Sequence, residues 1–148
     1  MKPDAFLLLA NRLASDAASG PEAHRSAISR AYYGAYLSVL NFKDDLGISC
    51  RIESKLSEHQ SLQQLLANSN VPPAIEISQR LANLHESRKE ADYEMGNLRS
   101  ENPSSSADAV KRANVVINLL SQCQQAPTRS QLMVGLMQYR KLLGLSPK

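Results

Sequence analysis

The stretch from His24 to Phe42, HRSAISRAYYGAYLSVLNF, constrains the fold more than any other part of the chain. Its only formal charges are arginines, although 21% of the whole sequence is charged. If this stretch is a helix, one of its sides carries Ile28 and, within about 60 degrees of it around the helix axis, five further mostly apolar residues. These are Ala31, Tyr32, Ala35, Val39 and Phe42. The opposite side would carry Arg30, Tyr33, Leu37 and Leu40. A helix that is apolar on two sides is covered on two sides, so we expect it at the centre of a helical bundle.

Gly34 lies between the two apolar sides of this predicted helix. Glycine costs a helix interior about 1 kcal/mol relative to alanine. The close approach of a neighbouring helix would offset that cost, so we expect Gly34 to mark such a contact.

Apolar residues recur with helical spacing in the rest of the chain, and Pro, Gly and capping residues mark the ends of the segments. The predicted helices cover about 3–19, 21–45, 58–67, 73–99, 106–125 and 132–143. Ser57 with Gln60, and Thr128 with Gln131, match the capping-box pattern. No segment alternates with the period of a strand, so the predicted fold class is all-α.

The composition limits the class of protein. With 148 residues, of which 43% are hydrophobic, the chain can form a single domain with one core. Its net charge of +3 permits a nucleic-acid partner without requiring one. Cys50 and Cys123 are too few for a zinc site or a disulfide framework, so we expect reduced thiols in a cytoplasmic protein. The apolar run Phe6–Ala10 is too short for a signal peptide or a membrane span, so we expect no membrane association.

The predicted helix 73–99 places two opposite charges on its apolar side. Arg88 and Asp92 fall within about 60 degrees of Leu81, as do Ile77, Leu84 and Met95. The two charged side chains are one helical turn apart and can form an ion pair. A buried ion pair is costly unless it is well satisfied, so we expect this pair to be kept for a reason other than stability.

Three segments together resemble the HEPN domain family. They are RSAISRAYYGAY from Arg25 to Tyr36, His59, and LHESRKEADYE from Leu84 to Glu94. The similarity is to small stand-alone prokaryotic proteins with an arginine before a Tyr-Tyr pair, here Arg30 before Tyr32 and Tyr33, and with Arg-x-x-Ala-Asp-Tyr, here from Arg88 to Tyr93. The resemblance covers about 6–125. It divides the chain into a HEPN-like bundle, 1–126, and an additional C-terminal helix and tail, 127–148, packed on the same domain.

The resemblance implies an up-and-down bundle of five to six helices that forms a homodimer, with a polar site between the protomers. Many HEPN proteins are metal-independent endoribonucleases of toxin–antitoxin or antiviral-defence systems, often paired with a nucleotidyltransferase partner. Their site is an arginine followed about four to six residues later by a histidine. The arginine can grip the scissile phosphate and the histidine can take the proton of the attacking 2'-hydroxyl, so neither a metal nor another cofactor is expected.

The candidate site residues follow from this pattern, with one departure. After Arg88, the places for the histidine hold Tyr93, Glu94 and Met95. Arg80 and His85 have the right spacing, but they are out of register with the Ala-Asp-Tyr landmark. The candidate catalytic residues are therefore Arg88, Asp92, Tyr93 and His85, and the candidate binding residues are Arg30, Tyr33, Arg80 and His59.

Several alternatives stay open. Arg88 and Asp92 either contact a phosphate or nucleotide, or tie their helix to the central one through Tyr33. Arg30 either bridges to Asp92 or lines a cleft, and His59 either lies at the surface as a capping residue or supplies the missing base. The protein is accordingly a HEPN-type protein that cleaves or only binds RNA or a nucleotide, or else a non-enzymatic helical module that holds a nucleotidyltransferase or another protein partner.

Overall fold

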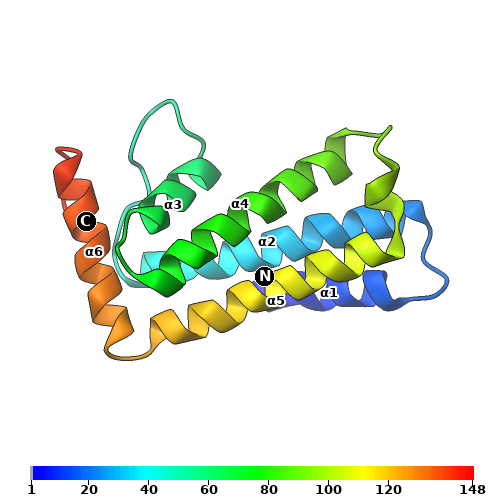
Figure 1. Ribbon diagram of the computed structural model, residues 1–148, viewed down its shortest axis with the longest axis horizontal. Coiled ribbons are helices and arrows are strands. Elements are labelled where there is room, and N and C mark those ends of the chain that lie inside the picture. The colour runs from blue at the N-terminus through cyan, green and yellow to red at the C-terminus, as the bar shows by residue number, and fades with distance from the viewer. Residues whose placement is uncertain (1) are drawn as a thin grey trace. The chain divides into compact units, whose positions relative to one another are not determined.

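The computed structural model describes residues 2–148. Within them the secondary structure consists of six α-helices and one 3-10 turn, with no strand. In chain order the elements are α1 (Pro3–Ser15), α2 (Pro21–Asp45), α3 (Glu58–Ala67), α4 (Pro72–Tyr93), η1 (Leu98–Glu101), α5 (Pro103–Gln124) and α6 (Thr128–Leu142) (Figure 1). The predicted all-α class is confirmed, and the chain is a helical bundle. None of the helices between residues 2 and 148 is long and apolar enough to cross a bilayer.

The chain divides into two compact units, which we describe separately. Unit 1 comprises the N-terminal residues through Ser38 together with Asn83–Val116, and unit 2 comprises Val39–Ala82 together with Ile117–Lys148. Helices α2, α4 and α5 contribute residues to both units. The predicted division into 1–126 and 127–148 stays a prediction.

In unit 1, α1 lies directly against α2. A Cβ atom placed on Gly34 would come within 2.5 Å of the side chain of Leu7, so the predicted close contact at this glycine is confirmed. The predicted apolar side of α2 is also confirmed, because all six of its residues are buried. The opposite side is only partly covered, since Arg30 is exposed and Tyr33, Leu37 and Leu40 are half-buried.

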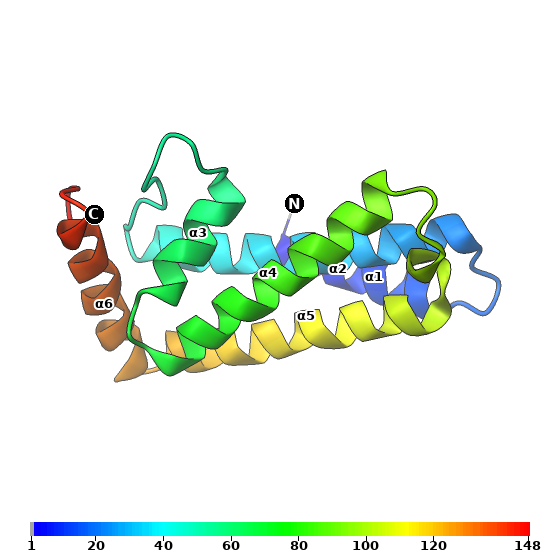
Figure 2. The same ribbon diagram turned by 45° about the horizontal axis from the view of Figure 1, so that its top comes forward.

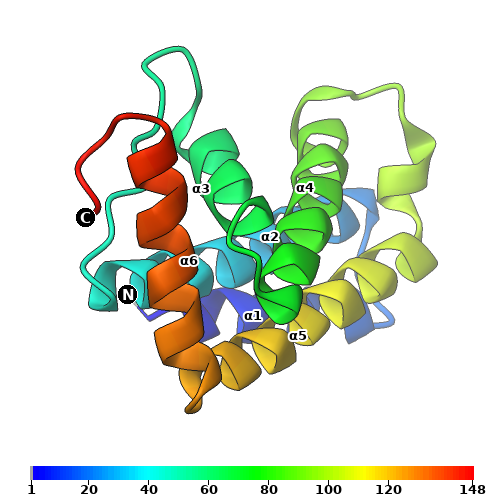
Figure 3. The same cartoon turned by 60° about the vertical axis from the view of Figure 1, so that its left-hand side comes forward.

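In unit 2, α6 contacts α3, and Figure 3 shows the orange-to-red α6 beside α3. The contact depends on Gly135, because a Cβ atom there would overlap the carbonyl oxygen of Ser69. Arg140, a buried residue of α6, donates to the carbonyl oxygens of Ser49 and Arg51 at 2.8 and 2.9 Å. These bonds hold the loop that follows α2.

The first helix is shorter than the sequence predicts. It stops at Ser15 instead of residue 19, because Asp16 takes an extended conformation with φ −73° and ψ 117°. The third helix begins as predicted. Ser57 and Gln60 form both hydrogen bonds of the capping box, at 3.1 and 3.2 Å.

Helix α4 also ends early, at Tyr93 instead of residue 99. The guanidinium of Arg25 donates hydrogen bonds to the carbonyl oxygens of Ala91 and Glu94, at 2.9 and 3.2 Å. In a longer helix these oxygens would accept backbone hydrogen bonds instead. Met95 therefore lies beyond the helix and is exposed. Its predicted place on the buried side of the helix was wrong.

The last two helices begin earlier than predicted. α5 starts at Pro103, and α6 starts at Thr128 instead of residue 132. The N-cap of α6 is Pro127, which has no side-chain capping bond, and its carbonyl oxygen accepts the N–H of Gln131 at 3.2 Å. The predicted capping box of Thr128 and Gln131 is therefore wrong, because Thr128 already belongs to the first helical turn.

Candidate functional site

Arg88 and Asp92 form the predicted ion pair on α4, in the part of the helix that belongs to unit 1. Arg88 Nε lies 2.9 Å from Asp92 Oδ2, and the side chains are 15% and 27% exposed. The geometry at Nε is not that of an aligned hydrogen bond, so this contact is an ion pair. The pair is partly buried, and the arginine remains reachable from solvent.

Two tyrosines flank the Arg88 guanidinium. Its Nη2 donates to the hydroxyl of Tyr33 at 2.7 Å and to that of Tyr93 at 3.3 Å. Its central carbon also lies 5.2 Å from the centroid of each ring, within the range of a cation–π contact. Nη1 forms no hydrogen bond with any of residues 2–148, so its donors can serve an acceptor from outside.

Ser29 completes this group, because its hydroxyl donates to Asp92 Oδ2 at 3.1 Å. We call Ser29, Tyr33, Arg88, Asp92 and Tyr93 the Arg88 cluster. Sequence reasoning missed Ser29, although a signal was present. Ser29 and Tyr33 are one turn apart on α2, so both polar groups point to the same side.

His85 lies one turn before Arg88 on the same side of α4. Its ring stacks on that of Tyr32, with centroids 5.0 Å apart and planes inclined by 10°. Burial, followed by the neighbouring hydroxyls of Tyr36 and Tyr33, raises the pKa of Tyr32 far above its ordinary value. Tyr32 is therefore neutral, and its ring packs against that of His85.

Arg30 lies at the edge of the Arg88 cluster. Its guanidinium carbon is 5.8 Å from the ring centroid of Phe6, and that ring is 6.4 Å from the ring of Tyr33. Among residues 2–148, the side chains that contact the Asp92 carboxylate are Arg88 and Ser29, so Arg30 does not form the considered bridge to Asp92.

The other two sequence candidates belong to unit 2 and are not part of the Arg88 cluster. Arg80 pairs with Glu76, whose Oε1 accepts from Nε and Nη2 at 2.9 and 2.8 Å. His59 is the second residue of α3 and is half-buried. Within unit 1 the fold thus brings together Arg88, Asp92, Tyr93, His85, Tyr33 and Arg30, and the candidates Arg80 and His59 belong to unit 2.

Arg25 supports the Arg88 cluster indirectly, through bonds to the backbone at the end of α4. The sequence analysis did not select it as a candidate. Its side chain is 10% exposed and pairs with Glu101 at 3.0 Å. It also donates to the carbonyl oxygens of Ala91, Glu94, Met95 and Asn97, at 2.9 to 3.2 Å. These oxygens include those at the end of α4, which have no partner within the helix. Arg25 therefore fixes the helical turn that carries Asp92 and Tyr93.

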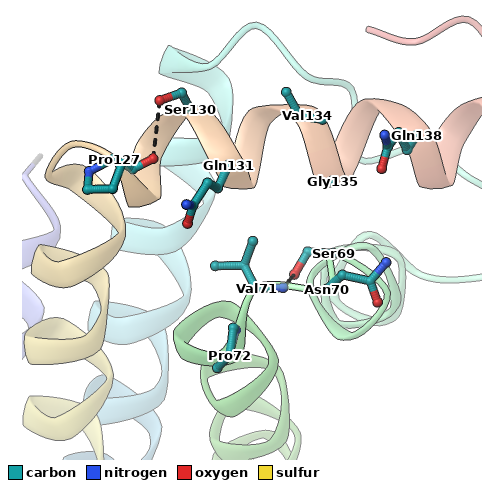
Figure 4. A pocket seen from close by; sticks show the side chains of 10 residues that line it. All are labelled: Ser69, Asn70, Val71, Pro72, Pro127, Ser130, Gln131, Val134, Gly135 and Gln138. Carbon is teal, nitrogen blue, oxygen red and sulfur yellow. Dashed lines mark hydrogen bonds between the residues drawn. The ribbon is translucent and has the colours of Figure 1, made fainter.

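A separate cavity of about 460 Å³ lies in unit 2 between α6 and the residues that join α3 to α4 (Figure 4). Its lining consists of Ser69, Asn70, Val71, Pro72, Pro127, Ser130, Gln131, Val134, Gly135 and Gln138. None of these side chains is charged, and the Ser130 hydroxyl donates a hydrogen bond to the carbonyl oxygen of Pro127 at 3.1 Å. This cavity lacks the ionisable groups of acid–base chemistry, which the Arg88 cluster and His85 supply.

No group of three or more His, Cys, Asp or Glu side chains within residues 2–148 is placed to hold a metal ion. Comparison of the chain with protein-family models, with curated proteins and with solved structures gave no match.

Proposed function

We propose that this chain is a HEPN-type protein that binds RNA at the Arg88 cluster. Arg88 would contact a phosphate group, and the exposed ring of Tyr93 would stack on a base. The observation that carries the proposal is the Arg88 guanidinium held between two tyrosine rings with Nη1 open to an outside acceptor. The motifs that resemble the HEPN family support the same function.

The contacts of Arg88 preorganise its guanidinium for binding a phosphate. Asp92 and Tyr33 fix the direction of the side chain, so little freedom is lost when an anion binds. Tyr93 is 69% exposed, which leaves its ring available to a base. Stacking of one base on an aromatic ring contributes about 1 to 3 kcal/mol.

Binding is better supported than cleavage. Removal of the proton from a 2'-hydroxyl needs a base within reach of the substrate. His85 is the only histidine beside Arg88 on α4, and its ring is packed against the buried ring of Tyr32. We therefore favour a relative that keeps RNA binding over an active endoribonuclease.

The test is the affinity of the full chain for a fluorescent single-stranded RNA, measured by anisotropy in the presence of a chelator. We expect Arg88→Ala to weaken binding about tenfold, because a hydrogen bond to a charged group contributes about 1.5 to 3 kcal/mol. Arg88→Lys should lose much of the affinity as well, since lysine has no planar fork. The matched control is Lys89→Ala, which removes the same charge from the neighbouring residue, a lysine that pairs with Glu86.

Two results would overturn this proposal: wild-type protein that does not bind the RNA, or a loss in Lys89→Ala equal to that in Arg88→Ala. The same samples, run on a denaturing gel, test cleavage. Chelator-resistant cleavage that disappears in both Arg88→Ala and His85→Ala would instead assign an endoribonuclease.

A second candidate function is supported by a different observation. Tyr93, Met95 and Leu98, around the end of α4 and η1, are 69%, 65% and 71% exposed. Exposed apolar side chains grouped in this way mark protein interfaces. The chain would then be an interaction module that pairs with a second copy of itself or with a nucleotidyltransferase. Sedimentation of wild type and Leu98→Lys tests the first partner: a dimer that dissociates in Leu98→Lys supports it, and a wild-type monomer opposes it.

A further inference from the structure

Unit 1 contains a second polar site, a cavity of about 170 Å³ where α4, η1 and α5 meet. Figure 2 shows α4 and α5 and the connecting segment between them, which contains η1. The polar side chains that carry the inference are those of Ser87, Arg99, Ser100, Ser105 and Arg112. The cavity is smaller than most small-molecule pockets, which measure about 300 to 1,000 Å³, but it can take a single small anion.

Ser100 and Arg112 give the clearest indication of a ligand. Ser100 is 3% exposed and lines the cavity, and its hydroxyl, which keeps contact with solvent, forms no hydrogen bond with any of residues 2–148. Arg112 Nε is buried and has no aligned hydrogen-bond partner among the described residues. Buried polar groups nearly always have a partner, and a ligand in the cavity would supply one.

Arg112 is already positioned for an anion. Its Nε lies 2.9 Å from Asp108 Oδ2, and its Nη2 donates to the Ser87 hydroxyl at 3.3 Å. Both contacts lie within unit 1 and hold the guanidinium at the cavity. Arg99, an exposed residue of η1, brings a second guanidinium, and its side chain forms no ion pair with any of the described residues. Guanidinium groups can only donate hydrogen bonds, so the site is rich in donors.

Two carboxylates also line the cavity and restrict which anion fits. Asp108 is paired with Arg112, and Glu90 Oε2 accepts from Asn97 Nδ2 at 3.3 Å. An anion without a proton would be repelled by a carboxylate at close range, whereas one that carries a proton can donate a hydrogen bond to it. Hydrogen phosphate and singly protonated phosphate monoesters have such a proton, and sulfate has none.

We propose that this cavity binds one phosphate group, either as inorganic hydrogen phosphate or as the terminal phosphate of a nucleotide, in preference to sulfate. Arg99, Arg112 and Ser100 donate to its oxygen atoms, and Glu90 accepts from its hydroxyl. The site is distinct from the Arg88 cluster, because Ser87 and Glu90 project from a different side of α4 than Arg88 and Asp92. The inference therefore does not rest on the proposed RNA binding.

Calorimetric titration of the full chain with sodium phosphate, sodium sulfate and a nucleoside 5'-monophosphate tests the proposal. We expect saturable phosphate binding in wild type, about tenfold weaker binding in Arg99→Ala, and none in Ser100→Asp, which places a carboxylate in the cavity. Tighter binding of the nucleotide than of inorganic phosphate assigns the nucleotide as the source of the phosphate, and the reverse assigns the free ion.

The matched control is Lys111→Ala, which removes the same charge from an exposed position next to Arg112 on α5. Lys111→Ala should bind phosphate like wild type. Melting temperatures without ligand show whether each variant is folded, and Ser100→Asn provides an uncharged comparison for Ser100→Asp. The proposal is overturned by absent saturable binding, by sulfate bound as tightly as phosphate, or by an equal loss in Lys111→Ala.

Discussion

Arg88 Nη2 donates a hydrogen bond of 2.7 Å to the hydroxyl of Tyr33, a residue 55 positions earlier in the chain. Asp92, the ion-pair partner of Arg88, accepts in turn from Ser29 on the same helix as Tyr33. The ion pair on α4 is therefore joined to α2 by two connected bonds. Groups linked in this way influence one another's energies, so their contributions have to be measured together.

Removal of the Asp92 carboxylate tests the energy of this network. A fully buried pair that loses one partner costs about 3 kcal/mol or more. Both side chains keep some solvent contact, so we expect Asp92→Ala to lower the free energy of unfolding by about 1 to 2 kcal/mol. Urea denaturation of Asp92→Ala, Arg88→Ala and the double variant gives the coupling energy.

The pair of Glu76 and Arg80 is a matched control, because it has the same spacing on the same helix but is more exposed, at 45% and 35%. We expect Glu76→Ala to cost at most about 0.5 kcal/mol. Equal losses in Glu76→Ala and Asp92→Ala would mean that the contacts from α2 add nothing to the second pair.

Arg25 should be among the most sensitive positions in unit 1. Arg25→Met keeps the length of the side chain but removes its bonds to Glu101 and to the carbonyl oxygens around the end of α4. We expect a loss of about 3 to 5 kcal/mol in the free energy of unfolding. Arg30→Met, at an exposed position on the same helix, should cost about 0.5 kcal/mol or less.

Hydrogen exchange would locate the effect of Arg25→Met. The amide groups of residues 94–97 should lose protection first, because the Arg25 side chain bonds to three carbonyl oxygens of that segment. Loss of protection spread evenly over unit 1, with residues 94–97 no faster than the rest, would show that Arg25 acts only through general packing.

Patterns of side chains predicted much of this fold. The apolar side of α2, the contact at Gly34 and the capping box of Ser57 were all visible, because each depends on residues close together in sequence. The spacing of Arg88 and Asp92 likewise predicted their ion pair.

The features that the sequence did not predict depend on contacts with distant backbone groups. The hydrogen-bond partners of Arg25 are mostly backbone carbonyl oxygens. Because every residue has such an oxygen, no pattern of side chains predicts these bonds. The early end of α4 and the exposure of Met95 follow from those same bonds. The cavity beside Ser100 is likewise set by η1, a short turn without a periodic signal.

Gly135 and Gly96 offer a matched pair of substitutions by alanine. The added methyl group at Gly135 would overlap the carbonyl oxygen of Ser69, and a backbone atom cannot move aside as a side chain can. We expect Gly135→Ala to lower the free energy of unfolding by about 1 to 3 kcal/mol. At Gly96 the methyl group meets nothing within 4 Å, so Gly96→Ala should be neutral or slightly stabilising. Comparable melting temperatures for the two variants would contradict the close contact of α6.

The two cysteines should differ in reactivity because the thiolate is the nucleophile. Burial raises the pKa of the Cys123 thiol from 9.0 to about 11, and burial also raises the pKa of the half-buried Cys50, although nearby Lys43 opposes that shift. At pH 8 we expect a disulfide reagent to modify Cys50 slowly in the native protein and Cys123 only after unfolding. Cys50→Ser and Cys123→Ala separate the two signals. Native Cys50→Ser that reacts as fast as native Cys123→Ala would contradict the burial of Cys123.

The same shift predicts how the stability depends on alkaline pH. A thiol whose pKa is higher in the folded than in the unfolded chain keeps its proton longer when folded. Its contribution is fully present below pH 9.0 and is lost as the pH rises through about 11. Cys123→Ala should therefore lose less stability than wild type between these values, measured by urea denaturation. An identical alkaline decline in both proteins would show that other groups, such as lysines and tyrosines, cause all of it.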